Sequence, residues 1–518
     1  MSKRSASPDD APTPSSKRAR SEAYVAPEPE STPGPVLEGH GEDLDDDEDV
    51  AFSAPTRQTA PNVGYEQLYL DTINRKRLDF DFEKLCSVTL SNINVYACLV
   101  CGKYYQGRGP KTQAYFHALQ DGHHVFINLE TKKIYVLPEG YEVKTSVLDD
   151  IKYNVAPYYT RQEVARLDKG QKPRMDLEKR SYVPGFVGLN NMKANDYFNV
   201  VIQALSHVTL LRNYVMLEVQ TDRDQLAKRF AALVGKIWNP KLFKMHVSPH
   251  ELIQEVALRS KKRFTLTEQS DPAEFLIWFL NNLHISMGGS KTKPRSSIVQ
   301  KIFQGGLKIE SQVITAKPGA GDRLRFEDAD VKSQISNFML LTLDLPAAPL
   351  FQDSNKSNII PQVSLLSLLN KYNGIQSQEK AKDRVRYRLQ HPLPPCLIFH
   401  IIRFTKNKFI SERNPTIVTF PRTIDMSDYV EPNPNLYPPA EPIYYDLVSN
   451  ITHEAVRKRD DSVSGEQERK VWRVQVQDKG SDAWWNIEDL YVDKERSETL
   501  FTKESYIQVW ERRKKANV

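Results

Sequence analysis

The sequence predicts an α+β protein in which a small metal-stabilised domain precedes a larger domain. From Tyr182 to the C-terminus, apolar residues recur at helical spacing in the first half, and strand-like apolar runs fill the second half. Before this segment, three cysteines and several histidines lie close together in the sequence. A length of 518 residues, with 40% apolar and 26% charged side chains, leaves room for roughly three domains of ordinary globular composition.

Residues 1–64 are expected to form a disordered tail. They are rich in Ser, Pro and Ala and contain the acidic run Glu42–Asp49, so they cannot bury enough apolar surface to offset their conformational entropy. Two basic clusters, at residues 3–4 and 17–20, are separated by a Ser/Pro spacer. This pattern indicates a bipartite nuclear-import signal and a location in the nucleus, with a solvated charged tail as the alternative.

Only four cysteines occur, at positions 86, 98, 101 and 396, and they do not make a disulfide scaffold. Three of them close together indicate a reducing compartment and a metal site. No apolar run approaches the roughly 18 residues of a membrane span, and no signal-like segment opens the chain, so no membrane association is expected. The net charge of +5 is small for this length and gives only weak support for a nucleic-acid partner.

The metal motif is Cys98-x-x-Cys101 followed by His117 and His123, which has the general spacing of a zinc site with two cysteines and two histidines. A Cys-x-x-Cys pair on a tight turn, closed here by Gly102, directs two thiolates at one tetrahedral ion. We therefore expect one structural zinc ion bound by these four ligands.

Gly122 is expected to end a helix that begins near Thr112, so that His123 reaches the ion from outside that helix. Cys86 and His124 are alternative ligands or neighbours of the ligands. A nucleic-acid-reading finger is disfavoured, because only one unit occurs and it is embedded in aromatic residues.

The expected domains follow from these signals. A lead-in that starts near Tyr65 and the cysteine–histidine region form one domain at residues 65–145, and residues 146–181 form a charged, helix-prone connector. The larger domain covers residues 182–518, and its strand-like runs include Phe338–Pro346 and Cys396–Phe404.

These segments resemble a known family. "CLVCGKYYQGRG" and "HALQDGHHVFINL" look like the zinc finger of ubiquitin proteases (UBP type), and "GLNNMKANDYFNVVIQAL" occupies the place of the Cys box of ubiquitin-specific proteases. Further matches occur at residues 269–276, 393–404, 418–430, 445–454 and 505–512. The resemblance implies a papain-like fold with fingers, palm and thumb after the zinc finger. With "YLDTINRKRLDFDFEKLC" before it, the chain is similar to one branch, the Sad1-type splicing factors of the spliceosomal tri-snRNP, which are inactive relatives of the proteases.

The resemblance places Asp196 where the proteases carry their nucleophilic Cys. A carboxylate is a poor nucleophile toward amides, and its attack would produce a high-energy mixed anhydride. The family's base, a His, is absent from residues 464–476, and His453 falls in an earlier strand where a His is an ordinary family feature.

The other catalytic positions are degenerate. Asn191 matches the family's oxyanion-hole Asn, and the orienting acid aligns with Glu488 or its neighbour Asp489. Since both nucleophile and base are missing, the resemblance implies a pseudo-deubiquitinase. Asp196 is expected to cap the helix that follows, whose residues 197–208 form an amphipathic pattern.

We therefore predict a non-catalytic nuclear scaffold that helps assemble or maintain the tri-snRNP in pre-mRNA splicing. The alternative is an active or residual deubiquitinase, whose only thiol in the larger domain is Cys396, in an apolar strand. Weak ubiquitin binding stays open, although the finger lacks Trp, and residues 303–341 lack the cysteines of a second zinc site. Direct RNA binding would need a basic surface, for which Arg384–His391 and Arg259–Phe264 are candidates.

Overall fold

The computed structural model describes most of the chain after the N-terminal tail, and the described residues all belong to the compact unit Arg57–Val518. The described ranges are 68–218, 224–318, 324–328, 331–347, 361–380, 383–406, 411–433, 441–457 and 468–513. The expected disordered tail, with its acidic run and import signal, lies outside the described residues.

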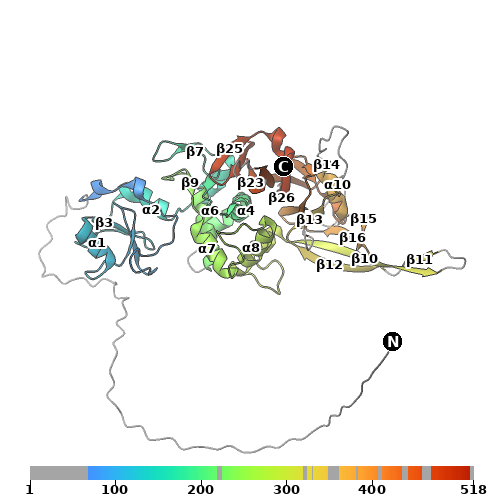
Figure 1. Ribbon diagram of the computed structural model, residues 1–518, viewed down its shortest axis with the longest axis horizontal. Coiled ribbons are helices and arrows are strands. Elements are labelled where there is room, and N and C mark those ends of the chain that lie inside the picture. Colours follow the sequence, from blue (N-terminus) through green and yellow to red (C-terminus); the bar gives the residue numbers. More distant parts are fainter. Residues whose placement is uncertain are drawn as a thin grey trace, which may run out of the picture. The chain divides into compact units, whose positions relative to one another are not determined.

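The cysteine–histidine region forms a five-stranded antiparallel sheet in the order β2-β1-β3-β4-β5, with helix α1 beside it (Figure 1). Its elements are β1 (Val95–Cys98), β2 (Tyr104–Gln106), α1 (Gln113–Asp121), β3 (Val125–Asn128), β4 (Ile134–Val136) and β5 (Tyr141–Glu142). Side chains alternate across a strand, so Ala97 and Ile127 enter one core while Cys98 and Phe126 enter another. The second core also contains Ala114 and Ala118 of α1, which puts the sulfur of Cys98 on the helix side of the sheet.

The lead-in and the connector pack into the neighbouring cores. Leu78 and Phe80 of the lead-in share a core with Leu148 and Ile151 at α2 (Asp149–Val155). α3 (Arg161–Arg166), which starts with a Thr160–Glu163 capping box, places Val164 in the core of the larger domain. The predicted connector is therefore helical only in short stretches, and β6 (Arg174–Met175) pairs with β7 (Ser181–Tyr182) after them. The domain boundaries drawn from the sequence stay predictions.

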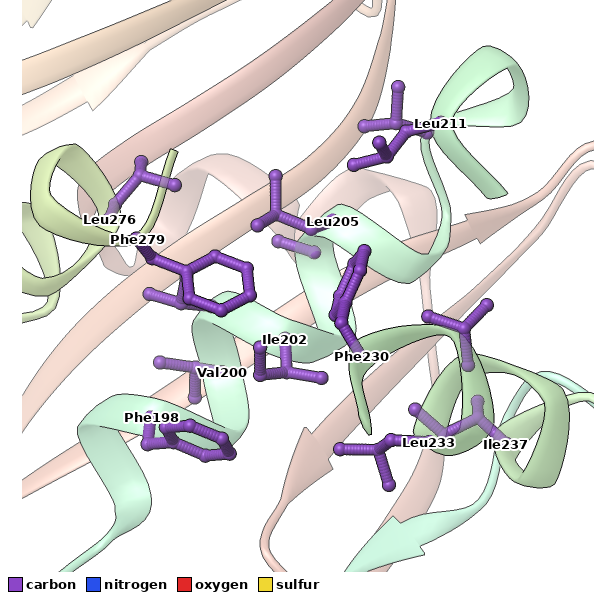
Figure 2. Close-up of a cluster of buried hydrophobic side chains, with 14 of the residues drawn as sticks. Phe198, Val200, Ile202, Leu205, Leu211, Phe230, Leu233, Ile237, Leu276 and Phe279 are labelled. Carbon is purple, nitrogen blue, oxygen red and sulfur yellow. The ribbon is translucent and has the colours of Figure 1, made fainter. Parts of the chain in front are cut away.

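The first half of the larger domain is helical, as predicted. Its helices are α4 (Asp196–Ser206), α5 (Thr209–Glu218), α6 (Gln225–Ile237), α7 (His250–Arg259), α8 (Pro272–Ser286) and α9 (Ile298–Phe303). Every residue of α4 is buried, so the predicted amphipathic pattern is wrong: this helix is surrounded on all sides. Figure 2 shows Ile202 and Leu205 of α4 among the rings of Phe230 (α6) and Phe279 (α8).

The second half is an eight-stranded sheet in the order β13-β17-β26-β22-β23-β24-β25, with β21 beside β22. Its strands are β13 (Leu341–Asp344), β17 (Cys396–Ile402), β21 (Thr423–Asp425), β22 (Tyr444–Arg457), β23 (Glu468–Asp478), β24 (Ala483–Glu488), β25 (Tyr491–Glu495) and β26 (Glu504–Arg512). Val474 and Val476 face the helical core, while Trp484 and Trp510 face a second core. Helices segregated on one face of a mainly antiparallel sheet confirm the α+β class.

A separate sheet extends from this body (Figure 1). It pairs β10 (Gly305–Pro318) with β11 (Leu324–Asp328), β12 (Lys332–Phe338) and β16 (Asp383–Gln390), and β16 with β15 (Asn373–Lys380). The remaining short elements include β8 (Gly188–Leu189) with β9 (His246–Val247), β14 (Gln362–Ser364) with β20 (Ile417–Thr419), β18 (Phe404–Lys406) with β19 (Ser411–Arg413), and α10 (Leu365–Leu369).

Among the described residues, no single helix has the length and hydropathy of a membrane span. The bent pair α4–α5 meets those criteria only when its two helices are taken together.

Candidate metal centre and protease-like site

Four side chains converge on one point: Cys98, Cys101, His117 and His123, whose ligand atoms all lie within 4.8 Å of one another. Cys101 Sγ lies 3.4 Å from His117 Nε2, and His123 Nδ1 lies 3.0 Å from the same nitrogen. Two thiolates and two imidazole nitrogens at this spacing fit the tetrahedral donor set of zinc.

Two glycine turns bring these ligands together. Gly102 has a φ of +79°, its N–H donates to the carbonyl of Cys98 at 2.9 Å, and a Cβ there would lie 2.2 Å from the carbonyl oxygen of Arg77. Gly122, with a φ of +68°, ends α1 one residue before His123. The prediction that His123 lies outside the helix that carries His117 is confirmed.

The surroundings of the ligands suit a bound cation. Asp121 Oδ2 lies 2.5 Å from His117 Nδ1, which fixes the ring and leaves Nε2 for a metal. The pKa of Cys101 is lowered, because the Cys98 thiol and the Lys103 N–H donate hydrogen bonds to its sulfur. Sequence reasoning missed Asp121, although its position four residues after His117 on one helix is a readable signal.

The two alternative ligands are placed elsewhere. The sulfur of buried Cys86 accepts a hydrogen bond from the Thr89 N–H at 3.4 Å. His124 Nδ1 lies 2.8 Å from the carbonyl oxygen of Leu137, and its ring stacks on Tyr69 with centroids 4.2 Å apart. In the described part of the chain, neither residue belongs to the converging group.

Asp196 stands at the start of α4, but not in the predicted role. The N-cap residue is Asn195, and Asp196 is the first residue of the helix. Its carboxylate accepts hydrogen bonds from its neighbour's N–H, on Tyr197, at 2.9 Å and from Gln269 Nε2 at 2.6 Å. Burial raises the pKa of Asp196, and these donors only partly oppose that rise. The assignment of Asp196 as the cap is therefore wrong by one position. The side chain of Asn195 makes no capping hydrogen bond and is held instead by Met192, Asn190 and Asn199.

Asn191, which the resemblance aligns with the oxyanion-hole Asn, is engaged within the fold. Its Nδ2 donates to Asp489 Oδ2 at 2.8 Å, and Asn199 Nδ2 donates to Asp489 Oδ1 at 2.9 Å. Asp489 lies at the turn between β24 and β25 with a φ of +50°. Glu488 points elsewhere and pairs with Arg473 at 2.6 Å. Of the two acids that the sequence left open, Asp489 is the one at this site, and it ties down the amide donors.

Strand β23, next to Asp196, presents a backbone N–H group to the carboxylate rather than a histidine side chain. The backbone N–H of Trp472 on β23 faces the Asp196 carboxylate and opposes the rise in its pKa that burial causes. His453 lies opposite Trp472 on β22, with ring centroids 4.9 Å apart, and also contacts Phe404. Among the described residues neither ring nitrogen of His453 makes a hydrogen bond, and its nearest carboxylate oxygen, on Glu504, is 3.7 Å away. His453 thus lies in the earlier strand, as the sequence suggested, and the structure adds that its ring packs among aromatic side chains.

The structure also shows where Cys396, the remaining thiol, and the two basic runs at residues 259–264 and 384–391 lie. Cys396 is fully buried at the start of β17, and burial raises the pKa of its thiol well above the usual value. Arg259 and Arg263 pair with Glu255 and Glu274, each at 2.8 Å.

On β16 the arginines at positions 384, 386 and 388 share the sheet face opposite buried Val385, Tyr387 and Leu389. These three arginines are only half-buried.

Comparison with known proteins agrees with this geometry. Residues 187–510 match the family model described as ubiquitin carboxyl-terminal hydrolase, and residues 86–148 match the model for the Zn-finger in ubiquitin-hydrolases and other proteins. The chain is 49% identical over 477 residues to "Probable mRNA-splicing protein ubp10" of Schizosaccharomyces pombe, covering 91% of this chain and 93% of that protein.

Two further relatives and one solved structure extend the picture. The chain is 45% identical to "Ubiquitin carboxyl-terminal hydrolase 39" of Homo sapiens, covering 86% of this chain and 80% of that protein. It is 32% identical to "Pre-mRNA-splicing factor SAD1" of Saccharomyces cerevisiae, covering 86% of this chain and 93% of that protein. A crystal structure of an essential yeast splicing factor superimposes with a TM-score of 0.69 at 31% identity, covering 86% of this chain and all of that one. The chain therefore belongs to the ubiquitin carboxyl-terminal hydrolase family and carries, ahead of the protease-like fold, the zinc finger found in these hydrolases.

Proposed function

We propose that this chain is a pseudo-deubiquitinase that acts as a scaffold in nuclear pre-mRNA splicing, in the assembly or maintenance of the tri-snRNP. The names of its relatives in two yeasts support the splicing role. The observation that carries the non-catalytic part is the Asp196 carboxylate at the start of α4, where the resemblance places the nucleophile and where Tyr197 and Gln269 donate hydrogen bonds to it.

Hydrolysis of an isopeptide bond needs a nucleophile, a base and donors for the oxyanion. Here Asp196 offers a buried carboxylate whose pKa is raised, and Trp472 offers a backbone N–H where a base is needed. Among the described residues, no imidazole hydrogen bonds to Asp196. The nucleophile and the base of the family's reaction are thus both replaced, which leaves the fold as a surface for binding.

One structural zinc ion, held by Cys98, Cys101, His117 and His123, completes the proposal. The ion would link the turn after β1 to α1. A small domain with a small hydrophobic core needs such a link for its stability. All four positions of a tetrahedral ion are then filled by protein, so the ion supplies no reactive position.

The test is depletion and add-back in a nuclear extract that splices a reporter pre-mRNA. Depletion should lower both splicing and the amount of tri-snRNP, and added wild-type chain and Asp196→Ala chain should restore them equally. Failure of folded Asp196→Ala to restore splicing would overturn the non-catalytic proposal. Unchanged tri-snRNP after depletion would overturn the scaffold role.

The alternative enzyme has a direct test with a ubiquitin probe that alkylates catalytic thiols. We expect no labelling, since the only thiol of the larger domain, Cys396, is buried with a raised pKa. Labelling of Cys396 in the folded protein would restore the deubiquitinase hypothesis. A weak contact with ubiquitin is compatible with a scaffold and is measured by titration, and RNA binding by the arginines of β16 would show a steep loss of affinity with salt.

A further inference from the structure

The loop of residues 87–94 joins buried Cys86 to strand β1 and carries an apolar surface that the metal centre does not use. Three aliphatic side chains project from it: Val88 is 60% exposed, Leu90 is 73% exposed and Ile93 is 63% exposed. A single exposed Leu is common on protein surfaces, but three large aliphatic side chains within six positions of one loop form a concentrated apolar feature. None of the three contributes a buried side chain to the finger.

The 87–94 loop has a defined shape. Backbone hydrogen bonds close it on itself and tie both of its ends to the region of β2, with the donor named first: Leu90 to Cys86 (3.0 Å), Cys86 to Ser91 (2.9 Å), Ser87 to Tyr104 (2.8 Å) and Gly107 to Asn94 (2.9 Å). Side chains add to this closure, since Thr89 Oγ1 donates to Gln106 Oε1 at 2.9 Å and Ser91 Oγ accepts from the Ile93 N–H at 3.2 Å. A loop with this many internal bonds holds its side chains in place before any partner arrives.

The conformation at Leu90 is unfavourable for a Leu. Its φ is +59°, in the left-handed region that Gly, Asn and Asp adopt readily and that bulky side chains rarely adopt. Gly or Asn at this position would relieve the strain, and either would remove an exposed apolar side chain. The folded chain therefore gains nothing from Leu90, in backbone or in burial. Strain of this kind is kept where a surface has a use in binding.

The composition of the loop limits what it can bind. No residue between Lys84 and Lys103 is charged, in a chain where 26% of residues are charged. Nucleic acids and anionic membranes are attracted by basic surfaces, which this loop does not offer. A projecting, uncharged, aliphatic loop is complementary in charge and shape to a concave apolar pocket on another protein.

We propose that the 87–94 loop is a preorganised docking element whose Val88, Leu90 and Ile93 side chains enter an apolar groove on a protein of the splicing particle. This inference rests on the proposed function, since it takes the particle as the source of the partner. The binding surface is therefore this loop of the finger, and it includes neither the metal ligands nor the protease-like site.

The test uses two single variants of the full-length zinc-loaded chain. Leu90→Asn replaces the strained side chain by one that favours the left-handed region, so its melting temperature should rise by about 2 °C. Its affinity for tri-snRNP particles that lack their own copy of this protein should fall by about 10- to 100-fold. Leu258→Asn is the matched control, because Leu258 is also 73% exposed but lies on α7. It should bind as wild type does. Val88→Ser serves as a second loop variant and should also weaken binding.

Each outcome decides a different point. If wild-type chain does not bind the particles, the proposed function fails and the loop inference falls with it. If wild type binds and Leu90→Asn and Val88→Ser bind equally well, only the loop inference is overturned. Equal weakening by Leu258→Asn also overturns it, since the effect would then belong to apolar area in general. If sedimentation of purified chain shows self-association that Leu90→Asn abolishes, the occupant is a second copy and the assigned partner is wrong.

Discussion

A buried ion pair joins the lead-in to the helical core of the protease-like domain. Asp81 is 7% exposed and Lys236, on α6, is 6% exposed, with Asp81 Oδ1 3.1 Å from Lys236 Nζ. Asp81 Oδ2 lies 3.1 Å from Lys244 Nζ and accepts a hydrogen bond from the Ser248 N–H at 2.9 Å. Lys236 Nζ also donates to the carbonyl of Phe80 at 2.7 Å. This arrangement predicts that the lead-in and the helical core unfold together.

Removing Asp81 and removing Lys236 should lower the free energy of unfolding by different amounts. Asp81→Asn removes the negative charge that faces the buried ammonium of Lys236 and leaves the Phe80 carbonyl as its hydrogen-bond partner, so we expect a loss of about 3–5 kcal/mol in the free energy of unfolding. Lys236→Met leaves Asp81 with Lys244 and Ser248, so we expect a loss of about 1–2 kcal/mol. The double variant should lose less than the sum of the single losses by about 2 kcal/mol, because neither charge is then left alone.

The stability that Asp81 and Lys236 contribute depends on pH, and the directions of their pKa shifts decide how. Burial alone would raise the pKa of Asp81, but the charges of Lys236 and Lys244 and the Ser248 N–H outweigh it and lower the pKa below 3.8. Asp81 therefore stabilises the fold above pH 3.8, and this contribution is lost as the pH falls through the lowered pKa. Burial alone would lower the pKa of Lys236, but Asp81 and other acids raise it above 10.5, so its contribution is lost only as the pH rises through that raised value. The destabilisation by Asp81→Asn should be constant from pH 5 to 9 and should shrink below about pH 4.

The assay is urea unfolding of the zinc-loaded chain, followed by circular dichroism at several pH values, with Lys76→Met in the lead-in as a control. Lys76 is exposed, so its replacement should change the free energy of unfolding by less than about 0.5 kcal/mol. A loss below about 1 kcal/mol for Asp81→Asn, or strict additivity in the double variant, would refute the reasoning.

Four further outcomes are expected. Cys98→Ser should reduce bound zinc, measured by atomic emission, from one ion per chain to none and should expose the amides of α1 to hydrogen exchange; retained zinc would count against the ligand set. Asp196→Cys should fold yet give no cleavage of diubiquitin above a Cys-free control, because no base stands beside it, and clear turnover would show that a base was overlooked. Because burial raises the pKa of Asp196, its stabilising contribution is present below pH 3.8 and lost as pH rises. Asp196→Asn should therefore raise the free energy of unfolding at pH 7 above that of the wild-type chain but not at pH 3, and an equal effect at both would contradict this. Replacing the basic residues at 17–20 by Ala should reduce nuclear import of a reporter fused to residues 1–25, and unchanged import would argue against the signal.

The sequence by itself determined the parts that depend on local spacing. The Cys-x-x-Cys pair, Gly102 and Gly122 predict the turn and the helix end that bring four ligands together, because a backbone with positive φ favours glycine. The helical half and the strand half of the larger domain follow from apolar periodicity, and the missing thiol is visible directly. Family resemblance then predicted the fold class.

The tertiary structure decided everything that depends on contacts between distant segments. Asn191 and Asp489 are 298 positions apart, so only the register of the large sheet shows that this acid, rather than Glu488, holds the oxyanion-position amide. The N-cap of α4 is Asn195 rather than Asp196, and the Asp196 carboxylate instead accepts a hydrogen bond from Gln269, 73 positions away, which the sequence does not show. The exposure and strain of Leu90 were also invisible in the sequence, because spacing alone does not show which apolar side chains the surrounding chain leaves uncovered or which residue takes a positive φ.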